Sequence, residues 1–143
     1  MLILRSESAE HTMRIAKDVG GSIKGGEWVC LYGTIGAGKT TFVKGLAQGL
    51  GVSEHVQSPT FTLMNRYETG RIPICHIDAY RMANAREIED TGVLDYFDDC
   101  IVVVEWAELL EDSLADIEEG KRINVVLEHE GPLEGRTIRI VRR

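Results

Sequence analysis

The sequence is short of the features that mark several large classes of protein. No apolar run approaches the length needed to span a membrane, and its three cysteines have no CxxC spacing. Basic residues are outnumbered 16 to 23 by acidic ones, which argues against a basic face that grips nucleic acid directly. MLIL at the start is too short for a secretory signal, and acidic residues follow soon after. We therefore expect a cytoplasmic protein with buried free thiols.

What remains is the composition of an ordinary globular protein. Of the 143 residues, 43% are hydrophobic and 27% are charged, which is enough to build a core and too apolar for a disordered chain. Repeats, low-complexity segments and linkers are not evident. We expect a single domain over residues 1–143.

Apolar periodicity predicts alternating helices and strands. Helical patterns cover residues 7–21, the segment from the glycine-rich loop to residue 51, and two short pieces, REIEDTG and VLDYF. The strand-like runs are EWVCLYG, TFTLMNRY, IPICHI, CIVVVEW and a late hairpin, RINVVLEH and RTIRIV, around the turn EGPLEG. The lack of alternation in CIVVVEW indicates helices over both of its faces. The predicted fold class is α/β, with a mostly parallel central sheet and an antiparallel edge.

The most specific motif is a phosphate-binding loop. Residues 33–40, GTIGAGKT, match G-x-x-x-x-G-K-[ST] between a predicted strand and a predicted helix. Glycines let successive backbone N–H groups surround an anion, and the helix N-terminus adds the positive end of its dipole. Lys39 is then the cation for the β- and γ-phosphates, and the Thr40 hydroxyl is a ligand for Mg²⁺. The loop predicts a P-loop NTPase-like nucleotide site.

Two carboxylates are candidates for holding the metal ion. Asp78 and Glu105 each follow an apolar strand, at the end where open α/β sheets place their ligands. Glu105 comes after four β-branched residues, where a carboxylate is expensive to desolvate without a nearby cation. The alternatives are a helix N-cap or an ion pair with Arg81 for Asp78, and an ordinary strand-ending charge for Glu105. Spacing does not say which of the two contacts the metal directly.

Three further residues have two interpretations each. Thr60 in SPTF either reaches the γ-phosphate or metal, as a switch-loop threonine does, or belongs to a simple strand-entry turn. Trp106 either stacks near the nucleotide or fills the core. His76 fits a core histidine better than a ligand.

Taken in order, GTIGAGKTTFVKGL, SPTF, HIDAYR and VEWAE closely resemble the bacterial TsaE family, the ATPases of the threonylcarbamoyladenosine tRNA-modification pathway. The resemblance covers nearly the whole chain and extends to Thr12 and to GRTIRI. It implies an ATP and Mg²⁺ site with Thr40 and Glu105 at the metal and Asp78 as the second acidic residue. Thr60 and Trp106 would lie near the nucleotide, with Thr12 towards the nucleoside. The implied catalytic residues are Lys39, Glu105, Asp78 and Thr60, and the implied nucleotide-binding residues are Thr12, Gly33, Thr34, Ile35, Gly36, Ala37, Gly38, Lys39, Thr40, Thr41 and Trp106.

The family resemblance also implies a role. TsaE proteins assist the threonylcarbamoyl-transferase complex, built from subunits of the TsaD and TsaB type, which modifies adenosine 37 of tRNAs that read ANN codons. Hydrolysis by this subunit is expected to reset that complex, and tRNA is reached only through it. Three positions depart from the family pattern: Thr34, Ala79 and Ala107 stand where an acidic residue, a leucine and a proline are usual.

Other nucleotide-dependent functions fit less well. A small-molecule kinase usually has an arginine-bearing lid, and this chain has no long insertion to form one. A GTPase needs N-K-x-D after the P-loop, which is absent from the sequence. Glu105 argues against a non-hydrolysing, nucleotide-dependent scaffold. Apart from Arg81, no arginine stands out as a source of transition-state charge, so we predict a weak ATPase that partners stimulate.

Overall fold

The computed structural model describes the chain except for residues 35, 58–63, 82–99 and 131–134. In the described part, seven strands form one sheet in the order β1-β7-β6-β2-β5-β4-β3. The strands are β1 (Leu2–Ser6), β2 (Trp28–Tyr32), β3 (Met64–Tyr67), β4 (Ile74–Asp78), β5 (Ile101–Glu105), β6 (Arg122–His129) and β7 (Arg136–Arg142). The helices are α1 (Ala9–Ser22), α2 (Lys39–Gly49), α4 (Glu111–Leu114) and the 3-10 helices η1 (Ala79–Arg81) and η3 (Ala107–Leu110). The predicted short helices at 86–97 and the first half of the predicted strand 60–67 lie outside the described residues.

The sheet is mixed rather than mostly parallel, which corrects the sequence prediction. β6, β2, β5 and β4 pair in parallel, whereas β1 with β7, β7 with β6, and β3 with β4 are antiparallel. The predicted hairpin of β6 and β7 is present, but β1 was not predicted and extends it. As an edge strand β1 buries little, with Leu2 51% and Ile3 58% exposed, so its pattern has no apolar face to detect.

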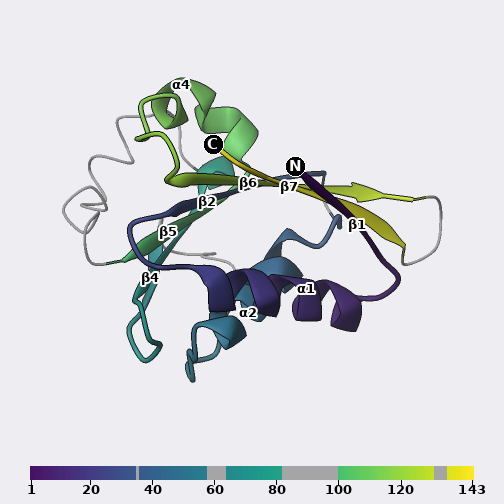
Figure 1. Cartoon of the computed structure of the whole chain (residues 1–143), viewed down its shortest axis with the longest axis horizontal. Helices are drawn as coiled ribbons and strands as arrows, with labels where there is room; N and C mark the ends of the chain where they lie inside the picture. The colour runs from purple at the N-terminus through teal and green to yellow at the C-terminus, as the bar shows by residue number, and fades with distance from the viewer. Residues whose placement is uncertain (35, 58–63, 82–99, 131–134) are drawn as a thin grey trace.

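Helices cover both faces of the sheet in the described part, as predicted. Figure 1 shows α1 and α2 against one face and α4 beyond the other. Alternation along β2 separates the two cores: Val29 and Leu31 pack with α1 and α2, and Trp28 and Cys30 pack with η3 and α4. The three cysteines are buried thiols, as expected. None of the described helices is long and apolar enough to cross a membrane.

Glycines bring α1 and α2 unusually close together. A Cβ atom added to Gly45 would lie 2.4 Å from the Met13 oxygen, and one added to Gly49 would lie 2.2 Å from the Lys17 oxygen. These contacts run in the same order along both helices, so α1 and α2 begin at the same end of the pair. The first turn of α1 therefore lies beside the phosphate loop. α1 also continues to Ser22, through the glycine pair predicted to end it.

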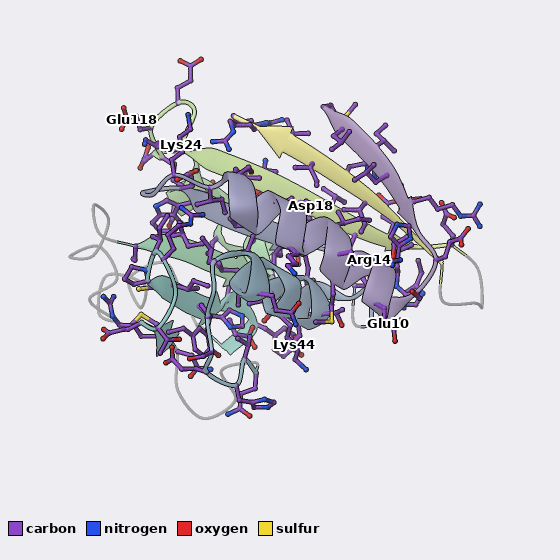
Figure 2. The ribbon with its side chains drawn as sticks, turned by 60° about the horizontal axis from the view of Figure 1, so that its bottom comes forward. Glu10, Arg14, Asp18, Lys24, Lys44 and Glu118 are labelled. Atoms are coloured by element: carbon purple, nitrogen blue, oxygen red, sulfur yellow. The ribbon has the colours of Figure 1, made fainter. Side chains whose placement is uncertain are left out.

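The outer face of α1 is charged, as its sequence pattern requires. Glu10, Arg14 and Asp18 are on the side of the helix away from the sheet (Figure 2). The buried positions include Thr12 and Ala16, which are four residues apart and therefore lie on one face of the helix. The helix is anchored at its start by the Ser8 side chain, which accepts a hydrogen bond from the His11 N–H.

Candidate functional site

A cavity of about 420 Å³ opens where the start of α1 and the start of α2 meet the ends of β4 and β5. Gly33 does not line it directly, and Ile35 and Thr60 lie outside the described residues. Ser8, Ala9 and Arg136 also line the cavity and were not predicted. The predicted site residues that line it are Thr12, Thr34, Gly36, Ala37, Gly38, Lys39, Thr40, Thr41, Asp78, Glu105 and Trp106.

The loop depends on glycine at both ends. Gly33 has φ +148°, and a Cβ atom there would lie 2.6 Å from the Leu127 backbone oxygen. Gly38, with φ +105°, is the residue directly before α2. L-residues rarely adopt these conformations, so glycine lets the backbone turn from β2 into α2 within a few residues. The first three residues of α2, Lys39 to Thr41, consequently line the cavity, and a helix N-terminus in such a position suits an anion.

Arg136 of β7 braces the outside of this loop. Its guanidinium donates from Nε to the Ala37 oxygen at 3.1 Å and from Nη2 to the Gly36 oxygen at 3.0 Å. These two bonds hold the turn of the loop against β7. Spacing and periodicity could not predict this contact, because Arg136 lies about a hundred residues beyond the loop and meets it only through the sheet.

Lys39 is buried within the loop, with 6% of its surface exposed. Its Nζ donates to the Gly33 oxygen and, at 3.1 Å, to the Thr34 oxygen. Burial lowers the pKa of this ammonium group, and the charges of Glu108, Glu105 and Asp78 oppose that shift. The lysine is therefore a buried cation facing nearby carboxylates.

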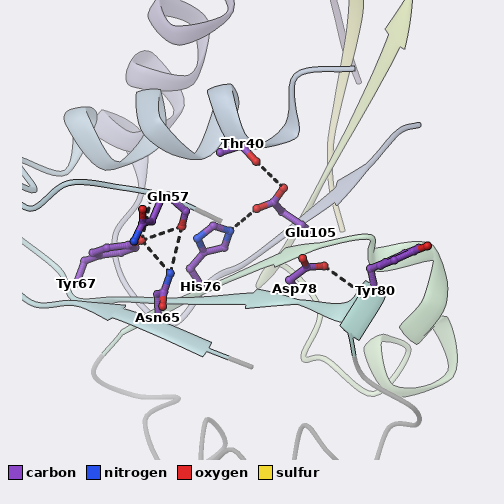
Figure 3. Close-up of polar contacts among 8 residues, drawn as sticks. All are labelled: Thr40, Gln57, Asn65, Tyr67, His76, Asp78, Tyr80 and Glu105. Carbon is purple, nitrogen blue, oxygen red and sulfur yellow. Dashed lines mark hydrogen bonds and ion pairs between the residues drawn. The ribbon is translucent and has the colours of Figure 1, made fainter. Parts of the chain in front are cut away.

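Glu105 ends β5 on the face that α2 covers, and it is also buried, at 4% exposure. Its Oε1 accepts a hydrogen bond from the Thr40 hydroxyl at 3.1 Å, and its Oε2 lies 2.5 Å from His76 Nε2 (Figure 3). Burial tends to raise the pKa of this carboxyl group. The bond to His76, then the His76 charge, the Thr40 bond and the Lys39 charge, outweigh burial and leave the pKa of Glu105 below its ordinary value.

Asp78 lies next to Glu105, at the end of the neighbouring strand. The two residues are direct partners in the parallel register of β4 and β5, and both line the cavity. Oδ1 of Asp78 also accepts the Tyr80 N–H at 3.0 Å at the start of η1, as the capping alternative predicts (Figure 3). Two adjacent carboxylates repel each other unless a cation lies between or near them.

These oxygens fit Mg²⁺ that is held jointly with phosphate. No group of three or more His, Cys, Asp or Glu side chains able to bind a metal ion occurs in the described part of the chain. Mg²⁺ commonly uses one or two carboxylates together with substrate phosphates and water, and does not need an all-protein cage. A hydroxyl from Thr40 and carboxylates from Asp78 and Glu105 supply that kind of partial set.

Trp106 is held in an uncommon backbone conformation beside the loop. Its φ of 60° and ψ of 42° lie in the left-handed region, which is rare for a bulky residue. Lys39 Nζ lies 3.6 Å from the centre of the indole ring, and the Tyr80 ring packs 5.3 Å away between centroids. The indole lines the cavity and also packs against the core beside η3, so both predicted positions apply to Trp106.

Comparisons with known proteins identify the family of the chain. The family model "Threonylcarbamoyl adenosine biosynthesis protein TsaE" matches residues 6–138. The tRNA threonylcarbamoyladenosine biosynthesis protein TsaE of Bacillus subtilis is 41% identical over 89% of this chain and 77% of its own length. The protein of the same name from Aquifex aeolicus is 44% identical over 78% of this chain and 79% of its own.

A solved structure gives the same result. The crystal structure of Bacillus subtilis YdiB superposes with a TM-score of 0.76 at 36% identity, over 96% of this chain and 82% of that one. The tRNA threonylcarbamoyladenosine biosynthesis protein TsaE of Treponema pallidum is likewise 41% identical to this chain. The chain belongs to the TsaE family, and its role lies in the biosynthesis of threonylcarbamoyladenosine in tRNA.

Proposed function

We propose that this protein binds ATP with Mg²⁺ in the cavity and hydrolyses it to ADP and free phosphate, as a P-loop NTPase. One observation carries the proposal. Lys39 and Thr40 of the loop, and Asp78 and Glu105 from two adjacent strand ends, line one cavity although they lie up to 66 positions apart in the chain.

Each residue has a distinct part in this reaction. The loop N–H groups and Lys39 hold the phosphates, and Thr12 of α1 lies at the side where the nucleoside would extend. Thr40 and Asp78 would bind the Mg²⁺ directly, and the metal would supply positive charge to the β- and γ-phosphates. Thr40 already donates to Glu105, so Glu105 would act by holding the threonine hydroxyl in place. Thr60 keeps its proposed catalytic role as an expectation from the family.

Hydrolysis is proposed to drive the cycle of a threonylcarbamoyl-transferase complex with subunits of the TsaD and TsaB type. Arg136, which lines the cavity, is engaged with two loop carbonyls, so it is poorly placed to neutralise charge on the γ-phosphate. Partner proteins commonly supply such charge in trans. The isolated protein should therefore turn over far more slowly than a typical kinase, whose rate is on the order of 1–100 per second.

The test is phosphate release from purified protein, alone and with the TsaD- and TsaB-type partners. Release should rise when the partners are added, and no added metabolite should become phosphorylated. Transfer of phosphate to a metabolite would support the small-molecule kinase instead, and binding of ATP without release in the full complex would support the nucleotide-dependent scaffold.

Two variants separate binding from chemistry. Lys39→Ala should lose tight ATP binding, whereas Glu105→Ala should bind ATP and hydrolyse it poorly. Normal hydrolysis by Glu105→Ala would remove that carboxylate from the mechanism. Depleting the protein in cells should lower threonylcarbamoyladenosine in bulk tRNA, and an unchanged level would contradict the proposed link between hydrolysis and modification.

A further inference from the structure

His76 is a buried partner of Glu105 to which the proposed reaction gives no part. It belongs to β4, two residues before Asp78, and its side chain is fully buried. Its Nε2 lies 2.5 Å from Oε2 of Glu105. Because an ionised carboxylate can only accept, Nε2 carries the hydrogen of this bond.

The carboxylate of Glu105 is therefore held from two sides. His76 donates to Oε2 from β4, and Thr40 donates to Oε1 from α2, as Figure 3 shows. Rotation of the carboxylate about its last side-chain bond would break both contacts together. Its orientation thus depends on the imidazole of His76 as well as on the Thr40 hydroxyl.

The other ring nitrogen of His76 shows that packing alone does not explain the residue. Nδ1 is buried and has no hydrogen-bond partner among the described residues. A buried polar atom without a partner lowers stability, and an apolar side chain on this face of β4 would avoid that loss. The histidine at this position is better explained by the bond that Nε2 makes.

We propose that His76 is a positioning residue for the ATP reaction, whose Nε2–H fixes the Glu105 carboxylate in the orientation in which it accepts from Thr40. The inference rests on the proposed ATPase function and deepens it. His76 acts only through Glu105 and does not touch the nucleotide. Residues that orient metal-associated ligands in this way commonly change metal affinity or activity by about 10–100-fold when replaced.

Replacing His76 by either of two amide side chains tests the contributions of its two ring nitrogens separately. His76→Gln puts an amide donor close to the position of Nε2, whereas His76→Asn puts one close to Nδ1, too short to reach Glu105. We expect kcat for ATP to fall about 10–100-fold in His76→Asn while KM changes less than about threefold. His76→Gln should recover most of the loss. The exposed His55, changed to Asn, is the matched control and should behave as the unaltered protein.

A merely structural role predicts a different pattern. If His76 only filled space, Gln and Asn would lower the melting temperature and kcat alike, and that equal loss would overturn the proposal. A rise in KM without a fall in kcat would also overturn the proposal.

Two further measurements keep the inference independent of hydrolysis. Mn²⁺ affinity, followed by electron paramagnetic resonance with a non-hydrolysable ATP analogue, should fall in His76→Asn and be kept in His76→Gln. If the unaltered protein binds the analogue but releases no phosphate, the proposed ATPase fails, and this Mn²⁺ comparison still decides the role of His76.

Without any ligand, long-range ¹H–¹⁵N spectra of the unaltered protein report which ring nitrogen of His76 is protonated. Protonation at Nε2 supports the proposal. A proton on Nδ1 with a bare Nε2 would contradict it, whatever the fate of the nucleotide assays.

Discussion

The two walls of the cavity are held in place by different kinds of interaction. The loop wall, residue 34 and residues 36–41, is shaped by main-chain conformation, with Gly33 and Gly38 at its turns and Arg136 bonded to its carbonyls. The strand wall, Asp78, Glu105 and Trp106, is shaped by sheet register and by side-chain contacts to His76, Tyr80 and Lys39. The difference implies that changes to the loop wall weaken nucleotide binding, whereas changes to the strand wall weaken turnover with binding kept.

The largest expected effect is on the loop wall, from Gly33→Ala. The added Cβ would lie 2.6 Å from a backbone oxygen at a φ of +148°. Strain on the order of 3 kcal/mol at this turn should lower ATP affinity by about 100-fold, as isothermal titration calorimetry would measure. Gly25→Ala is the control, because Gly25 also has a positive φ, +130°, but its Cβ would meet nothing within 4 Å. Equal loss of affinity in both variants would contradict the argument.

A smaller loss of binding is expected from Arg136→Met. This change removes the charged donors to the Gly36 and Ala37 oxygens, a loss of about 1.5 kcal/mol or roughly tenfold in ATP affinity. kcat at saturating ATP should stay within about threefold. Arg136→Lys keeps the positive charge but cannot make both hydrogen bonds at once, so it should give an intermediate affinity for ATP. A fall in kcat with unchanged affinity would place Arg136 in the chemistry instead, and the contrast between the walls would fail.

The strand wall should show its own pH dependence in stability. The pKa of Glu105 is lower in the folded protein than its ordinary value of 4.5, so this carboxylate stabilises the fold above that pH. The contribution is lost as the pH falls below 4.5 and through the folded-state pKa. Urea unfolding of the unaltered protein and of Glu105→Gln should therefore differ most near neutral pH and converge as the pH is lowered. A constant difference across that range would contradict the assignment.

The smallest expected signal comes from the contact between the walls. Lys39 Nζ lies over the Trp106 ring, so nucleotide binding that moves the ammonium should change the indole emission. Trp28→Phe removes the signal of the other tryptophan, and ATP titration of that variant should change Trp106 fluorescence. The same titration of a protein that also carries Lys39→Met should give no change. A Trp106 signal unaffected by ATP in the Trp28→Phe protein would mean that the two walls do not meet at this contact.

The contrast between the walls also explains what the sequence could predict. The loop is a local motif, so its residues and its position between β2 and α2 followed from spacing alone. Asp78 and Glu105 were found through their strands, since ends of parallel strands share one edge. Arg136 and the bond from His76 to Glu105 depend on which strands are neighbours and in what register, and no pattern within either segment contains that information. β1 was missed for the related reason that its pairing with β7, rather than its burial, makes it a strand.

The most direct test of the central claim is a crystal structure with a non-hydrolysable ATP analogue and Mn²⁺, read through the anomalous signal of the metal. The claim predicts one strong peak within bonding distance of Thr40 Oγ1 and the terminal phosphates, on the side that faces Asp78 and Glu105. A triphosphate bound by the loop with its metal turned away from both carboxylates would contradict it.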